Sequence, residues 1–94
     1  MKISELSGST RNVEVEATVV EKEEARDVNT KYGRTRVANA TIEDDSGRFK
    51  LTLWGEHADK VAEGNKIKIT NGFVSSFRDE LQLSVGKFGK LEIL

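Results

Sequence analysis

The chain has 94 residues, enough for one domain with a modest hydrophobic core. It contains no cysteine, which excludes disulfides, thiolate zinc sites and a cysteine nucleophile, and its single histidine excludes a histidine-rich metal cluster. Acidic and basic residues almost balance, at 16 against 15, so any charged binding surface must be local rather than global.

The sequence contains no segment expected to enter a membrane. No run of apolar residues approaches the ~20 needed to span a bilayer, and the first residues lack the apolar stretch of a secretory signal. We therefore expect a soluble, intracellular, cytoplasmic protein. Without repeats or linkers, a single domain is expected over residues 1–94, in which residues 1–11 are a lead-in segment with Ile3 and Leu6 tucked under one end of the core.

A long, bent strand is predicted over residues 12–25. Apolar residues take every second position from Val13 to Val19, and polar residues such as Glu14 lie between them. Successive side chains of a strand point to opposite faces, so the apolar set faces a core. The adjacent Val19 and Val20 break the alternation, as a bulge or bend would.

The next segment, residues 26–33, is polar, ends in a glycine and is predicted to be a loop. A second strand is predicted over residues 34–43, with alanine and isoleucine side chains inward and Asn39 and Thr41 outward. The Asp-Asp-Ser-Gly sequence that follows predicts a hairpin turn, in which Gly47 suits a left-handed backbone.

The only tryptophan of the chain lies in a third strand, predicted over residues 48–54. Its core-facing parity holds Phe49, Leu51 and Leu53. The opposite, solvent-facing parity holds Arg48, Lys50, Thr52 and Trp54. An indole in line with two cations and a hydroxyl suits a surface that stacks a flat, negatively charged partner. The alternative is that Trp54 ends its strand by bending over a barrel rim and packing there.

A short helix is predicted after the third strand. The period of the apolar residues changes from 2 to 3.6 between residue 55 and Ala62, which indicates about two helical turns, and Gly64 is a natural stop. Glu56 and Lys60 form an i,i+4 pair in the favourable order.

Two further strands complete the prediction. In the first, residues 66–77, the Asn71-Gly72 pair is either a hairpin turn or a bulge in a continuing strand. A turn is predicted at residues 78–80, and residues 86–89 are expected to loosen the last strand. The inward face of that strand is predicted to carry Leu81, Leu83 and Val85, and Leu91 and Ile93 are expected to close the chain after the loosened segment.

Five strands with one helix between the third and the fourth are the layout of the OB-fold. We therefore predict an all-β protein, a five-stranded OB-fold Greek-key barrel with a short helix between strands 3 and 4. Such a barrel binds oligonucleotides or oligosaccharides on the face of strands 2 and 3, helped by the loops that join strands 1–2 and 4–5.

A family resemblance is carried by residues 43–58 (EDDSGRFKLTLWGEHA) and 61–69 (VAEGNKIKI). They resemble the OB-folds of archaeal single-stranded DNA-binding proteins, which in turn resemble the DNA-binding domains of replication protein A. The resemblance extends from about residue 12 to residue 93, and Leu-Thr-Leu-Trp-Gly is its most specific part. It favours the bulge reading of Asn71-Gly72. It also implies that aromatic side chains of the third and fourth strands stack on bases, a role that falls on Trp54, Phe73 and Phe77.

Cations and polar side chains near these aromatics are the other candidates for contacts with a strand. Each one alone is equally well explained as a solvated surface group, whereas together they flank Trp54. Tyr32 either clamps a nucleotide or is an ordinary turn aromatic. These candidates are Arg26, Lys31, Tyr32, Arg34, Arg36, Asn39, Thr41, Arg48, Lys50, Thr52 and Arg78. The glutamates between residues 14 and 24 are expected to mark a wall away from the DNA.

No constellation of residues for catalysis is evident, so the chain is not expected to be an enzyme, and neither a metal nor a cofactor is expected. Asp44 and Asp45 form a carboxylate pair, but they lie in a predicted turn and lack a third ligand. His57 is expected on the exposed side of the short helix.

The combined expectation is sequence-tolerant binding of single-stranded DNA, or of RNA, in replication, recombination and repair at the nucleoid. The alternative is a protein-interaction module, a subunit of a replication-protein-A-like assembly that contacts other OB domains or replication and repair proteins. A third class is the nucleic-acid-reading appendage of an enzyme, such as an anticodon-binding OB-fold. The aromatic platform favours the first, and the near-neutral charge favours the second.

Overall fold

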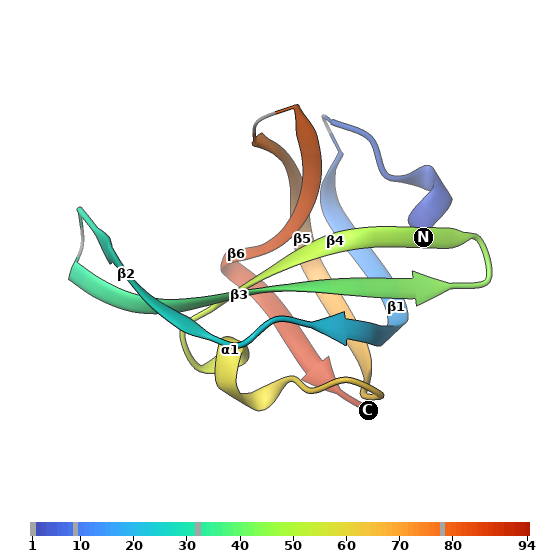
Figure 1. Cartoon of the computed structure of the whole chain (residues 1–94). Helices are drawn as coiled ribbons and strands as arrows, with labels where there is room; N and C mark the ends of the chain where they lie inside the picture. The colour runs from blue at the N-terminus through green and yellow to red at the C-terminus, as the bar shows by residue number, and fades with distance from the viewer. Residues whose placement is uncertain (1, 9, 32, 78) are drawn as a thin grey trace.

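Five strands close into a barrel in the computed structural model of the chain, which describes residues 2–8, 10–31, 33–77 and 79–94, without the side chains of residues 77 and 86–88. The barrel strands are β1 (Arg11–Lys22), β3 (Gly33–Asp44), β4 (Gly47–Trp54), β5 (Lys66–Phe77) and β6 (Glu80–Ile93). They pair in the order β1-β5-β6-β4-β3, and β3 pairs again with β1 to close the ring (Figure 1). These pairings are antiparallel, except that β4 and β6 are parallel. The predicted OB-fold barrel is confirmed.

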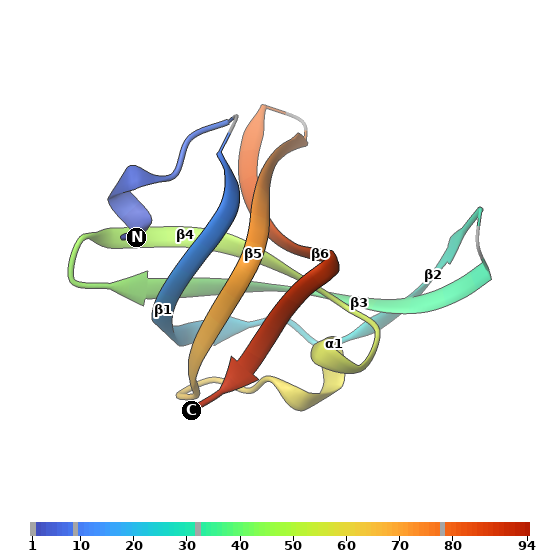
Figure 2. The ribbon, with the colours of Figure 1, turned by 180° about the vertical axis from the view of Figure 1, so that it is seen from behind.

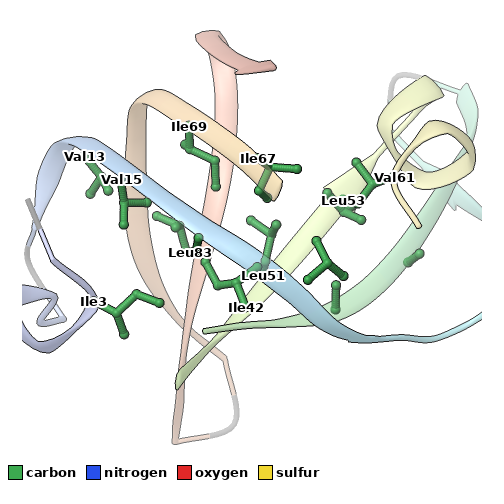
Figure 3. Packing of buried hydrophobic residues seen from close by; sticks show 14 of the residues in the cluster. Ile3, Val13, Val15, Ile42, Leu51, Leu53, Val61, Ile67, Ile69 and Leu83 are labelled. Carbon is green, nitrogen blue, oxygen red and sulfur yellow. The ribbon is translucent and has the colours of Figure 1, made fainter. Parts of the chain in front are cut away.

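Alternate residues of the barrel strands meet in one hydrophobic core (Figure 3). The largest enclosed side chains are Val13, Val15, Val19, Ile42, Leu51, Leu53, Val61, Ile67, Ile69 and Leu83. Ile3, from the 3-10 helix η1 (Ile3–Glu5), is buried at one end of this core, and Leu6 packs partly against it, as predicted. Each Å² of apolar surface removed from water stabilises the folded state by roughly 25 cal/mol. Burial of this core is therefore the main source of stability.

The segment predicted as a loop, residues 26–33, contains a strand, and that prediction was wrong. β2 (Arg26–Thr30) pairs antiparallel with residues 33–37 of β3. The two strands project from the barrel as an arm, at the left of Figure 1, and we call them the β2–β3 arm. No described residue between 26 and 36 belongs to the core. The arm therefore shows no apolar alternation from which a strand could be predicted, and backbone pairing with β3 makes it one.

The helix is shorter than predicted. α1 spans Glu56–Lys60, five residues, and does not continue to Gly64. The N–H of Gly64 donates to the carbonyl oxygen of Val19 at 2.8 Å, so the chain beyond α1 attaches to the barrel instead of extending the helix, and Ala62 is exposed. The predicted ion pair of Glu56 and Lys60 is present at 3.3 Å. In the described part of the chain, no helix has the length and apolar character needed to cross a membrane.

Strand β6 also differs from the prediction. It extends from Glu80 to Ile93 as one strand, but residues 86–89 have no register partner on β5, so the expected loosening is present as an interruption of the pairing. These residues lie opposite the single residue Asn71 of β5, and the strand bends there, as the two limbs of β6 in Figure 2 show. Leu81, predicted to face the core, is 40% exposed, because the β5–β6 hairpin extends beyond the core at that end.

A bulge at Asn71 keeps β5 continuous and excludes the hairpin alternative. Asn71 has a φ of 57°, and the register of β5 shifts beside it against both β1 and β6. A Cβ on the neighbouring Gly72 would lie 3.0 Å from Cγ2 of Ile69 and 3.1 Å from the carbonyl oxygen of Ser84, so a larger residue at this crowded crossing would have to push its neighbours apart by a few tenths of an ångström. The predicted break near Val20 is likewise a bulge, between β1 and β3.

The carboxylate of Asp44 ties the β3–β4 turn to η1. Its Oδ2 accepts the N–H of Ile3 at 2.9 Å, and its Oδ1 accepts the N–H groups of Ser46 at 2.7 Å and Gly47 at 3.2 Å. Partial burial raises the pKa of Asp44, but these hydrogen bonds and one from the Ser46 hydroxyl outweigh it, so the pKa lies below its ordinary value of 3.8.

We expect Asp44→Asn to destabilise the protein at neutral pH and to do so less in acid. Because the folded-state pKa is lowered, the carboxylate's contribution is complete above the unfolded-state pKa of about 4. It is lost as the pH falls through the lower folded-state pKa. Urea unfolding of both proteins at a series of pH values should show the difference in unfolding free energy narrowing below about pH 4. A difference that stays constant or widens in acid would contradict this account.

Candidate nucleic-acid interface

Register pairing places polar side chains of three strands and one phenylalanine of a fourth in one row on the outside of the barrel. Asn39 of β3 lies opposite Thr52 of β4, Thr52 opposite Ser84 of β6, and Ser84 opposite Phe73 of β5. Directly opposed residues of neighbouring strands share a face. We call the surface that this row crosses the polar face. It joins residues that lie far apart in the sequence, which is why only part of it was predicted.

A groove of about 440 Å³ lies on the polar face, and its walls come from the β2–β3 arm and the β5–β6 hairpin. Figure 1 shows both hairpins projecting from the barrel. The lining is formed by Arg26, Val28, Asn29, Thr30, Val37, Asn39, Thr52, Trp54, Ser75, Ser76, Gln82 and Ser84. Among these residues hydroxyl and amide groups predominate, with one cation, one indole and no carboxylate. This chemistry suits a flat ligand that is neutral or negatively charged.

Trp54 lies in the wall of the groove and is 44% exposed. Its cross-strand partner on β3 is Val37, which is only 6% exposed although it is not part of the barrel core. The indole therefore packs beside Val37 and also leaves part of its surface open. Trp54 points outward, as its parity with Lys50 and Thr52 predicts for a stacking residue. It also packs at the rim of the barrel, as the alternative interpretation predicts, so one position satisfies both.

Buried hydroxyl groups form the floor of the groove. Thr52 is 6% exposed and Ser84 is 8% exposed. The hydroxyl of Thr52 donates to Oε1 of Gln82 at 2.7 Å, which holds the Gln82 amide in place and leaves its Nε2 donors for another partner. Hydroxyl and amide groups at this position can bond to base edges.

Arg26 is the predicted cation that the structure brings to Trp54. It lines the groove, is exposed, and has no ion pair with the described carboxylates. Its backbone lies opposite Val37, the residue beside the indole. Lys31 is exposed just after β2, near the end of the arm, and does not line the groove.

Arg34 and Arg36 are not brought to the groove. Their parity on β3 is that of the inward-facing Ala38, opposite to that of Val37. Nε of Arg36 lies 3.0 Å from Oδ1 of Asp59 on α1, and both arginines lie 3.7 Å from Asp27. Two of the predicted cations thus face away from Trp54 and have carboxylate partners. The sequence could not show this, because the arm that carries them was not recognised as a strand.

Arg48 and Lys50 lie on the polar face but are also paired. Nζ of Lys50 lies 2.7 Å from Oε2 of Glu80, and Nε of Arg48 bonds to Glu43. The hydrogen bond and charge of Glu80 raise the pKa of Lys50, so this lysine is fully protonated at neutral pH. The two cations are therefore neutralised within the chain in the absence of a ligand.

The predicted acidic wall comes closer to the site than expected. Thr41, Asn39 and Lys50 line a second hollow, of about 540 Å³, together with Glu21, Glu23 and Glu63. The amide nitrogen of Asn39 lies 3.5 Å from Oε2 of Glu23. This hollow borders the groove, so its carboxylates form an acidic margin on the side of Thr41, and a polyanion is guided away from that side.

Phe73 reaches the polar face because of the bulge at Asn71. Before the bulge Ile69 points into the core, and after it Val74 does, so Phe73 points outward and is 39% exposed. Phe77 belongs to β5 and pairs with Glu80, but its side chain lies outside the described part of the structure. Tyr32 and Arg78 also lie outside the described residues.

Several residues of the groove were not predicted from the sequence. They are Val28, Asn29, Thr30, Val37, Ser75, Ser76, Gln82 and Ser84. For Gln82 and Ser84 the sequence does contain a signal, because they alternate with the apolar Leu83 and Val85 and are therefore expected on the outward face of the strand. The signal could not be used without knowing that β6 pairs in parallel with β4, which brings Ser84 next to Thr52.

The comparisons with known proteins agree with this geometry. A family model described as single-stranded DNA binding protein Ssb-like, OB fold, matches residues 5–93. The single-stranded DNA binding protein Ssb of Saccharolobus solfataricus is 38% identical over 90 residues, which are 96% of this chain and 61% of that protein. The chain thus spans less than two thirds of this curated relative.

Two solved structures share the fold. An OB domain from Thermoplasma acidophilum has a TM-score of 0.86 and 26% identity, covering 100% of this chain and 85% of that one. The second OB-fold domain of replication protein A from Methanococcus maripaludis has a TM-score of 0.82 and 28% identity, covering 100% and 93%. Since the family model matches nearly the whole chain, the protein belongs to the Ssb-like family of single-stranded DNA-binding proteins with an OB fold.

Proposed function

We propose that the domain binds single-stranded DNA with little dependence on base sequence. The observation that carries this proposal is the half-exposed indole of Trp54 in the wall of an open groove that is free of carboxylates among its described residues. Stacking of a base on an aromatic ring is worth about 1–3 kcal/mol and works for every base, because each base has a π-face. Membership in the Ssb-like family supports the same ligand.

Stacking and hydrogen bonding contribute more than charge in this proposal. Of the predicted cations that the structure describes on the polar face, Arg48 and Lys50 are engaged with glutamates, and Arg26 is not. Trp54 and Phe73 provide two stacking surfaces on the same face, and the hydroxyl and amide groups between them bond to bases without selecting one sequence. The domain acts without catalysis or a cofactor.

The cellular role follows from the ligand. Binding of this kind protects unwound DNA at the nucleoid during replication, recombination and repair. The protein would also contact other OB domains or replication and repair proteins. RNA single strands present the same base faces, so the domain would bind them through the same groove.

A second candidate function is a protein-interaction module within a replication-protein-A-like assembly. The observation in its favour is that Arg34, Arg36, Arg48 and Lys50 all have carboxylate partners within the chain, which leaves little free positive charge for phosphates. This function would leave the polar face unoccupied by nucleic acid.

A fluorescence titration distinguishes the two functions. Because only unpaired bases offer their faces to Trp54, single strands should bind far more tightly than duplex. Adding oligo-dT should quench the fluorescence of the lone tryptophan until the site saturates, whereas the same sequence as duplex should quench it only weakly. Equal affinity for both forms, or no quenching with excess oligo-dT, would exclude the proposed function and favour the interaction module.

Trp54→Ala should weaken oligo-dT binding by about 1–3 kcal/mol, the value of one stacked base. Its effect on unfolding free energy should be smaller than that of Leu53→Ala, which removes a side chain only 1% exposed and should cost about 2–5 kcal/mol. Urea denaturation of both variants, beside titrations followed by anisotropy of labelled oligo-dT, measures both effects. If Trp54→Ala unfolds as readily as Leu53→Ala and binds normally when folded, the indole is a packing residue and the site lies elsewhere.

Glu80→Gln should tighten binding by freeing Lys50 for a phosphate. Exposed ion pairs contribute only about 0–1 kcal/mol to stability, so a phosphate can displace Glu80 from Lys50. Breaking that ion pair lowers the affinity of the wild-type protein for the strand. With two to four phosphates neutralised, the wild-type slope of log K against log salt should be roughly −1.5 to −3, and Glu80→Gln should steepen it by about 0.7.

The matched control for this variant is Glu56→Gln, which frees Lys60 on α1, outside the groove, with the same change in net charge. Anisotropy titrations with oligo-dT at several salt concentrations measure both slopes. Equal effects of Glu56→Gln and Glu80→Gln would mean that net charge alone matters and that Lys50 does not contact the strand.

A further inference from the structure

A third hollow, of about 370 Å³, lies over β1 and β5, beyond Phe73 on the side away from the groove. It is lined by Arg11, Asn12, Asn71, Gly72, Phe73 and Val74, and shares none of its described lining with the groove. The hollow and the groove meet through the backbone, since Phe73 pairs with Ser84 and Ser84 lines the groove. A ligand that leaves the groove over Ser84 therefore reaches Phe73 and then this hollow.

Two bulges give the hollow its side chains. Without a bulge Arg11 would share the inward parity of Val13, but the register shifts by one residue at Asn12, which turns Arg11 outward. The bulge at Asn71 does the same for Phe73 on the neighbouring strand. Both asparagines have left-handed backbones, with φ of 55° and 57°. Non-glycine residues are held in this conformation at some cost, and such positions cluster at binding sites.

The result is an arginine beside an aromatic ring. Arg11 lies directly opposite Phe73 in the β1–β5 pairing, and both side chains are exposed. Directly opposed side chains lie about 4.5–5.5 Å apart at Cβ, so the guanidinium can reach over the ring or past it. Arg11 has no ion pair with the described carboxylates. A second arginine and aromatic residue, Arg26 and Trp54, lie together at the other side of the polar face.

We propose that Arg11 is a phosphate-binding residue, which makes the hollow a second subsite by holding the phosphate next to a base stacked on Phe73. The proposal rests on the proposed function and extends its binding path. The strand runs from Arg26 and Trp54, across Ser84, to Phe73 and Arg11. Two strand spacings and two residues separate Trp54 from Phe73, or roughly 12 Å between Cα atoms. A strand long enough to span this distance occupies both subsites, and a very short one occupies only one.

Removing Arg11 tests the proposal, and Lys66 provides a matched control. Lys66 is exposed at the opposite end of β5, has no ion pair with the described carboxylates and lines none of the hollows. Arg11→Gln and Lys66→Gln each remove one positive charge. Binding of each variant is measured by Trp54 quenching with a 12-nucleotide oligo-dT and with a dinucleotide, which is too short to span both subsites, at several salt concentrations.

Arg11→Gln should weaken binding of the 12-mer roughly three- to tenfold and make its salt slope shallower by about 0.7, the loss of one phosphate contact. Dinucleotide affinity measured through Trp54 should not change, and Lys66→Gln should change neither affinity beyond roughly twofold. Equal effects of the two variants on the 12-mer would overturn the subsite. So would an equal loss for dinucleotide and 12-mer, because Arg11 would then act at Trp54. If the wild-type domain itself shows no quenching, the proposed function fails as well.

Discussion

Strand β1 pairs with two partners, and the barrel depends on this. Its first half, through Thr18, pairs with β5, and its second half, from Thr18 to Lys22, pairs with β3, with a bulge after Val19. A single sheet with free edges is thereby closed into a ring, so the barrel strands lose the unpaired edges that invite aggregation. Closure also fixes the direction of the remaining side chains, since each strand must present its apolar parity to the enclosed core.

The polar face is a consequence of that closure. Successive side chains of a strand point to opposite faces, so a residue next to a core residue faces outward. Asn39, Thr52 and Ser84 face outward for this reason, because Ala38, Leu51 and Leu83 are buried in the core. The bulge at Asn71 reverses the parity of β5 from that residue onward, and this places the aromatic residue Phe73 on the same face. Charge has a smaller part in this surface, because its lysine and one of its arginines are held by glutamates of adjacent strands.

Alternation explains what could be predicted from the sequence. The core, the outward position of Trp54 and the β3–β4 turn follow from local periodicity, and so do Asn39 and Thr52 in the groove. Strand β2 did not follow, because its polar residues face solvent on both sides and pairing alone orders them. The ion pairs Arg36–Asp59 and Lys50–Glu80 join residues more than 20 positions apart, and no local feature of the sequence indicates such partners. Family resemblance, not periodicity, favoured the bulge that directs Phe73 outward.

The β2–β3 arm contributes to the groove and not to the barrel core. It supplies Arg26, Val28, Asn29 and Thr30 to the groove, yet none of its described residues between 26 and 36 enters the core. Changes in the length or charge of the arm should therefore leave the barrel core intact, although Arg36 also links the arm to Asp59 of α1. Much of one groove wall and the barrel core thus come from different segments of this chain, so a substitution in the arm can alter ligand contacts without creating a cavity in the core.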